Sequence, residues 1–193
     1  MYRRDCYLPD GTRKKTREGS LFSNMNSRCG LRYKATNLTY EKCSVSDNFR
    51  DFQFFARWCN EQIGFNKMDS NGCYWELDKD ILIKGNKIYS ENTCVFVPKV
   101  INSFFVKADK IRGNLPIGVR AHSKYTNKFQ SSVTNPFTRK VQYCGTYQSI
   151  EEAFEAYSKQ KHKIAVELAV MFKDEIRNDV YNVLLNYYPD IKD

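Results

Sequence analysis

The chain of 193 residues is 41% hydrophobic and 15% aromatic, which supplies enough apolar surface for a packed core and argues against a disordered chain. Its formal net charge of +9 is concentrated in residues 1–34, with nine Lys/Arg against three Asp/Glu, and in residues 107–149, with eight against one. Regional positive charge is typical of a polyanion-binding surface. The alternative is that the lysines are scattered over the surface and only keep the protein solvated. The polar start and the lack of an eighteen-residue apolar run predict neither a signal peptide nor a membrane span.

The seven cysteines are odd in number and contain no C-x-x-C pair. This pattern favours neither a disulfide framework nor a zinc ribbon. We therefore expect buried free thiols and a cytoplasmic location.

Residues 1–20 combine basic residues with a Pro9-Asp10-Gly11-Thr12 turn signal, which predicts a basic arm or short hairpin. Leu21, Met25 and Cys29 then share one face of a helix that starts near Ser20. A second helix is expected from a cap at residues 46–48 to about residue 59, followed by a loop over residues 60–72.

The next segment reads as strand, turn, strand and helix. Residues 75–83 predict a strand with Glu76, Asp78 and Asp80 alternating along it, and Gly85-Asn86 marks a turn. A second strand over residues 94–97 leads to Pro98, which is well suited to start a helix through Phe105.

Residues 107–116 predict a linker, because they combine Gly-Asn with Pro. Three short strands are expected after it, over residues 117–121, 129–134 and 140–147. Ser149 and Glu152 form a capping box, so a helix should follow. Its apolar spacing continues to Tyr188 and predicts either one long helix or two helices joined near Gln160.

The acidic residues are the first candidate site. Asp78 and Asp80 lie at i, i+2 and share a face on a regular strand, and Asn102 lies about one turn into the following helix. Carboxylate and amide oxygens suit a hard divalent cation, which can stabilise charge during phosphodiester hydrolysis. The alternative is that the alternating acids form the solvated face of the strand.

Between Trp75 and Phe105 the chain has Leu77-Asp78-Lys79-Asp80, Gly85-Asn86-Lys87, Tyr89-Ser90-Glu91-Asn92, Cys94-Val95-Phe96-Val97-Pro98 and Ile101-Asn102 in this order. This segment resembles the HNH, or ββα-metal, finger of bacteriophage HNH endonucleases, including the homing type. Residues 25–29 and 45–58 also look like the N-terminal region of that family.

The HNH resemblance implies catalytic roles for Asp78, Asp80, Asn92 and Asn102. Asp78, Asp80 and Asn102 would bind the metal, expected to be Mg²⁺ or Mn²⁺. The segment contains no histidine, so the residue that activates water in the family has no counterpart. Lys79 is a poor substitute, because its ordinary pKa is about 10.4.

Residues 117–120, 128–130, 143–147 and 149–157 follow the order of a second family. They resemble the Apetala-two DNA-binding domain of plant ethylene-response proteins, in which a three-stranded antiparallel sheet enters the major groove and a helix braces it. The resemblance implies DNA contacts from Arg120, Lys128 and Tyr143. Arg120, Lys128, Lys124, Arg139 and Lys140 would also place positive charge on short strands that fit a groove about 12 Å wide. A basic strand face that binds nothing is the alternative.

These observations predict an α+β fold. Its parts are a basic arm (1–20), an HNH-like ββα-metal domain with N-terminal helices (21–106), a linker (107–116), an Apetala-two-like sheet-and-helix domain (117–160) and a C-terminal helix (161–193). The apolar stripe of that last helix would cover the N-terminal helices or form a homodimer.

Two functions are expected from this organisation. The first is a phage-type HNH endonuclease of the infected bacterial cytoplasm, which nicks double-stranded DNA by metal-dependent hydrolysis. The second is a DNA-binding protein with a degenerate finger that acts as a regulator or antagonist of host factors. A protein directed at RNA is a third reading, which preference for single strands would support.

Overall fold

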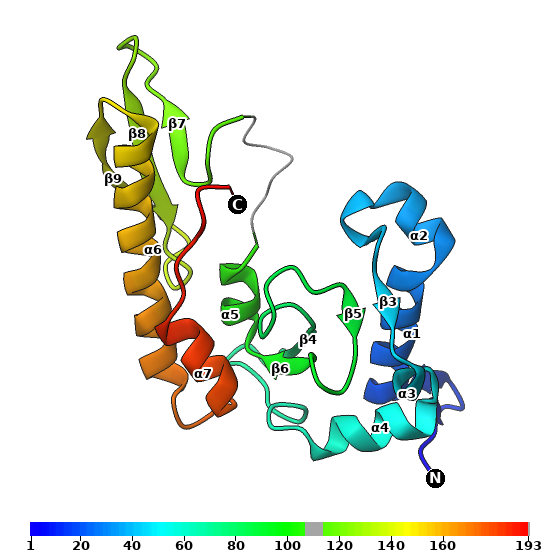
Figure 1. The fold of residues 1–193 in the computed structure, drawn as a ribbon. Helices are drawn as coiled ribbons and strands as arrows, with labels where there is room; N and C mark the ends of the chain where they lie inside the picture. The colour runs from blue at the N-terminus through cyan, green and yellow to red at the C-terminus, as the bar shows by residue number, and fades with distance from the viewer. Residues whose placement is uncertain (107–113, 193) are drawn as a thin grey trace. The chain divides into compact units, whose positions relative to one another are not determined.

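A computed structural model describes residues 1–106 and 114–192 of the chain, and the fold is α+β. The described residues form two compact units, Met1–Lys99 and Val100–Asp193 (Figure 1). The predicted boundary at residues 107–116 falls largely outside the described residues. None of the helices in the described part of the chain is both long enough and apolar enough to cross a membrane.

The first unit begins with a β-hairpin, as the turn signal predicts. Strand β1 (Asp5–Tyr7) pairs antiparallel with β2 (Arg13–Lys15). Helix α1 (Arg17–Cys29) follows directly, because the Thr16 hydroxyl accepts a hydrogen bond from the amide of Gly19 and caps the helix. Helix α2 (Leu31–Thr36) and the 3₁₀ helix η1 (Leu38–Tyr40) complete this segment.

The predicted second helix is two helices, α3 (Asp47–Arg50) and α4 (Phe52–Glu61). Ser46 caps α3, as expected, but Asp51 adopts an extended conformation and caps α4 through the amide of Gln53. A local side-chain bond to the backbone therefore interrupts the helical pattern. The apolar side chains still meet in one core: Phe22, Met25, Phe49, Phe52, Phe55 and Trp58 are all buried.

Short strands complete the first unit. Strand β3 (Ser44–Val45) pairs parallel with β5 (Ile88–Tyr89), and β4 (Glu76–Asp78) pairs antiparallel with β6 (Val95–Val97). The expected strand over residues 75–83 is thus wrong beyond Asp78. Helix α5 (Lys99–Phe104) follows Pro98, as predicted, and from Val100 onwards it belongs to the second unit.

The second unit contains the three predicted strands. Strands β7 (Val119–Ala121), β8 (Phe129–Thr134) and β9 (Val141–Tyr147) form an antiparallel sheet in that order. Helix α6 (Ile150–Phe172) packs against all three strands, and Figure 1 shows it running along one side of the sheet. The Ser149 hydroxyl accepts from the Glu152 amide at 3.1 Å, which confirms the predicted helix start.

Helix α6 passes through Gln160 without a break but ends at Phe172, so neither one long helix to Tyr188 nor two helices joined near Gln160 is correct. Its buried stripe continues through Tyr157, Ile164 and Leu168, and no Gly or Pro interrupts it. The chain turns only after Phe172, where the amide of Ile176 bonds to the Phe172 carbonyl. Helix α7 (Asn178–Leu185) then packs against α6 in the same unit.

Candidate nucleic-acid interface

The register of the sheet defines which side chains share its outer face. Arg120 lies opposite Gln130, and Gln130 lies opposite Thr146, so these three residues form one row across the strands. Paired residues on antiparallel strands point to the same side of a sheet. Arg120 and Thr146 are exposed, so this row faces solvent.

The inner face of the sheet is covered by α6. Val119, Ser131 and Val133 are buried on this side. The Gln160 side chain of α6 donates to the Gln142 side chain of β9 at 3.4 Å. The helix thus braces the sheet from behind, and Arg120, Tyr143 and Thr146 on the outer face are exposed among the described residues.

A β-bulge turns Tyr143 to the outer face. Ser131 pairs with Gly145 but Ser132 pairs with Tyr143, so Cys144 is an extra residue in β9. Without this residue, Tyr143 would share the inner side of the sheet with Gly145, because successive side chains alternate between faces. The bulge leaves the Tyr143 side chain 61% exposed, beside the row that contains Arg120.

Hydrogen bonds orient the outer side chains. The Nε of Arg120 donates to Oε1 of Gln130 at 2.9 Å, and the Tyr143 hydroxyl is hydrogen-bonded to that of Thr146. Such bonds restrict the rotamers of two long side chains before a ligand arrives, which lowers the entropy cost of binding. Gln130 and Thr146 were not predicted as site residues, since only the strand register places them beside Arg120 and Tyr143.

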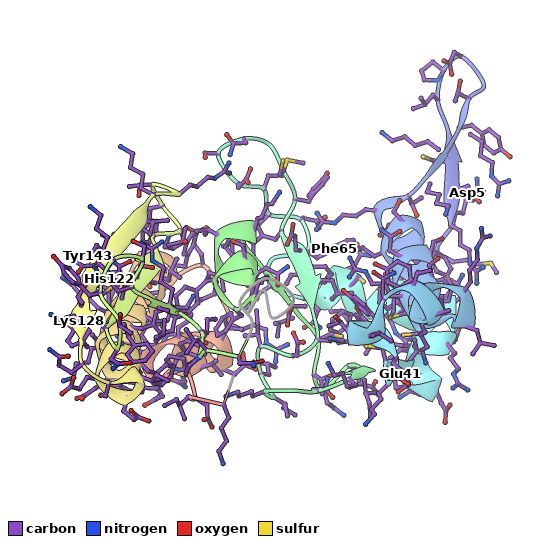
Figure 2. All side chains as sticks on the ribbon, turned by 90° about the horizontal axis from the view of Figure 1, so that it is seen from above. Asp5, Glu41, Phe65, His122, Lys128 and Tyr143 are labelled. Atoms are coloured by element: carbon purple, nitrogen blue, oxygen red, sulfur yellow. The ribbon has the colours of Figure 1, made fainter. Side chains whose placement is uncertain are left out.

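The β7–β8 loop adds two of the predicted lysines. The His122 Nδ1 accepts hydrogen bonds from the amides of Lys124 and Tyr125, at 3.0 and 3.2 Å. This histidine thus shapes the loop that holds Lys124. The Lys128 ammonium lies 5.2 Å from the centre of the Tyr125 ring. Figure 2 shows His122, Lys128 and Tyr143 at the sheet of this unit.

The β8–β9 loop carries the remaining predicted cations at the other end of β8. Asn135 organises it, because its side-chain oxygen accepts from the amides of Phe137 and Thr138. Arg139 and Lys140 are exposed, and Arg139 has a left-handed backbone with φ of 57°. All six predicted DNA-binding residues thus lie on the outer face of the sheet or on the loops at its ends.

The predicted catalytic carboxylates have local partners. The Asp78 Oδ1 accepts from the amides of Asp80 and Ile81, at 2.7 and 2.8 Å, and these bonds turn the chain away from β4. Burial, followed by the nearby Asp80 charge, raises the pKa of Asp78 to about 6. The Asp80 Oδ2 lies 3.0 Å from the Lys79 ammonium.

Each of these carboxylates has one oxygen bound to another group. The Asp78 Oδ1 accepts from two backbone amides and the Asp80 Oδ2 pairs with the Lys79 ammonium, so a cation would compete with these partners or bind the other two oxygens. Within residues 1–106 and 114–192, no group of three or more His, Cys, Asp or Glu residues lies close enough together to hold a metal ion. The metal site at Asp78, Asp80 and Asn102 therefore stays a prediction.

The other predicted catalytic residues are asparagines. Asn92 is exposed in the turn before β6, and Asn102 lies half-buried in α5. Asn102 belongs to the second unit and Asp78 to the first, so their predicted convergence stays a prediction. The remaining histidine, His162, stacks on Tyr188 with ring centres 4.0 Å apart.

Comparisons with known proteins found no relative of this chain. No protein-family model matches the chain, and no curated protein or solved structure matches it either. Both family resemblances therefore stay predictions based on short motifs.

Proposed function

We propose that the chain binds duplex DNA through the outer face of the β7–β8–β9 sheet. The observation that carries this proposal is the outer row of Arg120, Gln130 and Thr146, with Tyr143 turned towards the same side by the bulge. Arginine is the side chain best suited to paired contacts with guanine, and tyrosine combines an apolar ring with a polar tip. A braced, solvent-facing sheet presents both without rearrangement.

The cations at the two ends of β8 support the same function. A strand of six residues spans roughly 17–20 Å, so about the length of β8 separates the loop that holds Lys124 and Lys128 from the loop that holds Arg139 and Lys140. This spacing lets basic side chains reach phosphates on both sides of a major groove about 12 Å wide, while the outer face lies between them. Phosphate contacts would position the sheet, and Arg120 and Tyr143 would contact base edges.

Duplex DNA is favoured over duplex RNA as the ligand. The major groove of A-form RNA is too deep and narrow for side chains to read, whereas that of B-DNA admits a β-ribbon. Single-stranded RNA stays a separate outcome of the test, since Tyr143 could also stack on an unpaired base.

The test measures binding of the full chain to labelled duplex DNA, single-stranded DNA and single-stranded RNA by fluorescence anisotropy. We expect Arg120→Ala to weaken duplex binding by about tenfold, because a good base contact contributes roughly 1–3 kcal/mol. Lys163→Ala is the control, because Lys163 is an exposed cation on α6 away from the sheet. Equal losses in the two variants would contradict the proposal, and tighter binding to single-stranded RNA would redirect it.

A second candidate function is phosphodiester hydrolysis by an HNH-like finger. The antiparallel pair of β4 and β6 followed by α5 favours it, because this is the order of a ββα finger. Supercoiled plasmid is incubated with Mg²⁺ or Mn²⁺ and wild type, Asp78→Ala or Asn102→Ala. Relaxed circles from wild type alone would establish the nuclease, and equal cutting by all three would indicate contamination. If none of the three relaxes the plasmid, this candidate function is wrong.

A further inference from the structure

The β1–β2 hairpin of the first unit forms a well-defined ribbon. Its register pairs Asp5 with Lys15, Cys6 with Lys14 and Tyr7 with Arg13. At the tip, the amides of Leu8 and Gly11 donate to the carbonyls of Thr12 and Leu8, at 2.9 Å in both cases. Gly11 has φ of 82° and open space around it, so the turn is tight and unobstructed.

The base of this ribbon is fixed to the helices of its unit. The Gln53 side chain of α4 accepts from the Tyr2 amide at 2.8 Å and donates to the Tyr2 carbonyl at 2.9 Å. The Arg4 guanidinium lies over the rings of Phe22 and Phe52, at 4.7 and 5.1 Å. A Cβ at Gly19 would collide with the Arg4 carbonyl, so this glycine permits the close approach.

Beyond this base the ribbon makes few contacts and is almost entirely exposed. Figure 2 shows the hairpin that contains Asp5 standing away from the helices of the first unit. All three residues of β2 are exposed, and so are Cys6, Tyr7 and Leu8. The hairpin is anchored at its base and exposed along its length, so it does not contribute side chains to the hydrophobic core of its own unit.

The charges of β2 lie on both faces of the ribbon. Arg13 and Lys15 share one face with Tyr7, and Lys14 lies on the opposite face. The Arg13–Asp5 ion pair is exposed on the Arg13 side, with 68% of that side chain accessible, so it contributes little stability and a phosphate can compete for Arg13. Lys15 donates to the Ser23 hydroxyl, which is a neutral partner.

We propose that the β1–β2 hairpin enters a groove of duplex DNA and forms a second nucleic-acid contact, separate from the β7–β9 sheet. A two-stranded ribbon fits the major groove, and cations on both of its faces can reach the phosphates of both strands. Tyr7, which is 73% exposed, lies on the same face as Arg13 and would contact bases. The choice of DNA as the ligand rests on the proposed function of the sheet.

The test uses the full chain with Lys14→Gln/Lys15→Gln and the control Arg32→Gln/Lys42→Gln, which removes two exposed positive charges elsewhere in the first unit. Duplex affinity is measured between about 50 and 200 mM salt. Each phosphate contact contributes about 0.9 to the slope of log K against log salt, so the hairpin variant should have a slope shallower by nearly 2. The control should keep the wild-type slope.

A third variant, Arg120→Ala/Tyr143→Ala, separates this inference from the proposed function. If it weakens binding while the hairpin variant behaves like its control, the hairpin inference is wrong and the sheet function stands. If the hairpin variant flattens the slope while Arg120→Ala/Tyr143→Ala keeps the wild-type affinity, the hairpin inference stands and the sheet function is wrong. Binding to vesicles that contain phosphatidylserine is measured as well. If the hairpin variant loses vesicle binding but keeps the wild-type salt slope for DNA, the inference is wrong and the hairpin contacts a membrane surface instead.

Discussion

Asp78 is the residue whose ionisation should most affect the first unit. Burial raises its pKa to about 6, from an ordinary value of 3.8. Between pH 6 and 4 the folded chain therefore binds a proton that the unfolded chain has released. The ionised carboxylate lowers the stability of the fold above pH 6, and this cost disappears as the pH falls towards 4.

We therefore expect Asp78→Asn to raise the melting temperature at pH 8 and to lose this advantage near pH 4. The asparagine keeps an oxygen that can accept from the amides of Asp80 and Ile81 but carries no charge. Thermal unfolding followed by circular dichroism checks this. Asp69→Asn is the control, because Asp69 also caps a turn, through the amides of Asn71 and Cys73. An equal increase in melting temperature at both pH values would disprove the electrostatic explanation.

Gly118 and Gly72 allow the steric and backbone effects of a glycine to be separated. Both have left-handed backbones, with φ of 79° and 74°. A Cβ at Gly118 would collide with the Tyr157 ring of α6, whereas a Cβ at Gly72 would meet nothing within 4 Å. Both alanine variants should lose roughly 1–2 kcal/mol through backbone strain.

Gly118→Ala should lose about 1–3 kcal/mol more than Gly72→Ala, since it also displaces Tyr157 from the contact between α6 and β7. Urea unfolding gives the two free energies of unfolding. Equal losses would show that the packing around Tyr157 relaxes without cost.

At the scale of elements, Lys161 joins α5 to α6 within the second unit. Its ammonium donates to the Phe104 carbonyl at 2.6 Å and lies 3.8 Å from the centre of the Phe104 ring. The lysine is 8% exposed, and burial lowers its pKa to about 8 from 10.5. Between these two values the unfolded chain holds a proton that the folded chain has released, so this lysine makes the fold more stable as the pH rises.

Lys161→Met removes both the titrating group and the hydrogen bond. We expect the stability of wild type relative to the variant to increase between pH 7 and 9.5, because only wild type gains from releasing the proton. Urea unfolding at the two pH values measures this difference. A difference that stays constant with pH would show that Lys161 keeps its proton in the folded chain.

Local sequence patterns predicted some features of the helices and strands but not others. The helix caps at Ser46 and Ser149 were predicted, because capping involves residues three positions apart. The interruption at Asp51 and the early end of β4 were not predicted. In both cases the side chain of an aspartate accepts hydrogen bonds from nearby backbone amides and ends the helix or strand there. The sequence pattern alone does not show whether an aspartate will do this or will let the element continue.

At the scale of the whole molecule, the seven cysteines, all within the described residues, are free and differ in accessibility. Cys43, Cys59 and Cys94 are buried as expected, but Cys6 and Cys73 are exposed, so the expectation of buried thiols is wrong for these two. Burial also raises the thiol pKa values of Cys59 and Cys94, which lowers the fraction of reactive thiolate. We expect Ellman's reagent to label about two thiols per native chain rapidly, and all seven after denaturation.

The double variant Cys6→Ser/Cys73→Ser is the control for this labelling, and it should remove the rapid phase. Rapid labelling of more than two thiols in the native wild type would mean that the core of the first unit opens readily.

The amino-acid sequence by itself determined the basic hairpin, the three strands over residues 117–147, the capped helix after them and the set of basic residues on that sheet. These depend on turn chemistry, capping and alternation, which act over a few residues. Only the tertiary structure decided that a bulge at Cys144 turns Tyr143 outward, that Gln130 and Thr146 flank it, and that Gln53 and Arg4 anchor the hairpin. Strand register and contacts between distant segments depend on how whole elements pack, so no local pattern contains them.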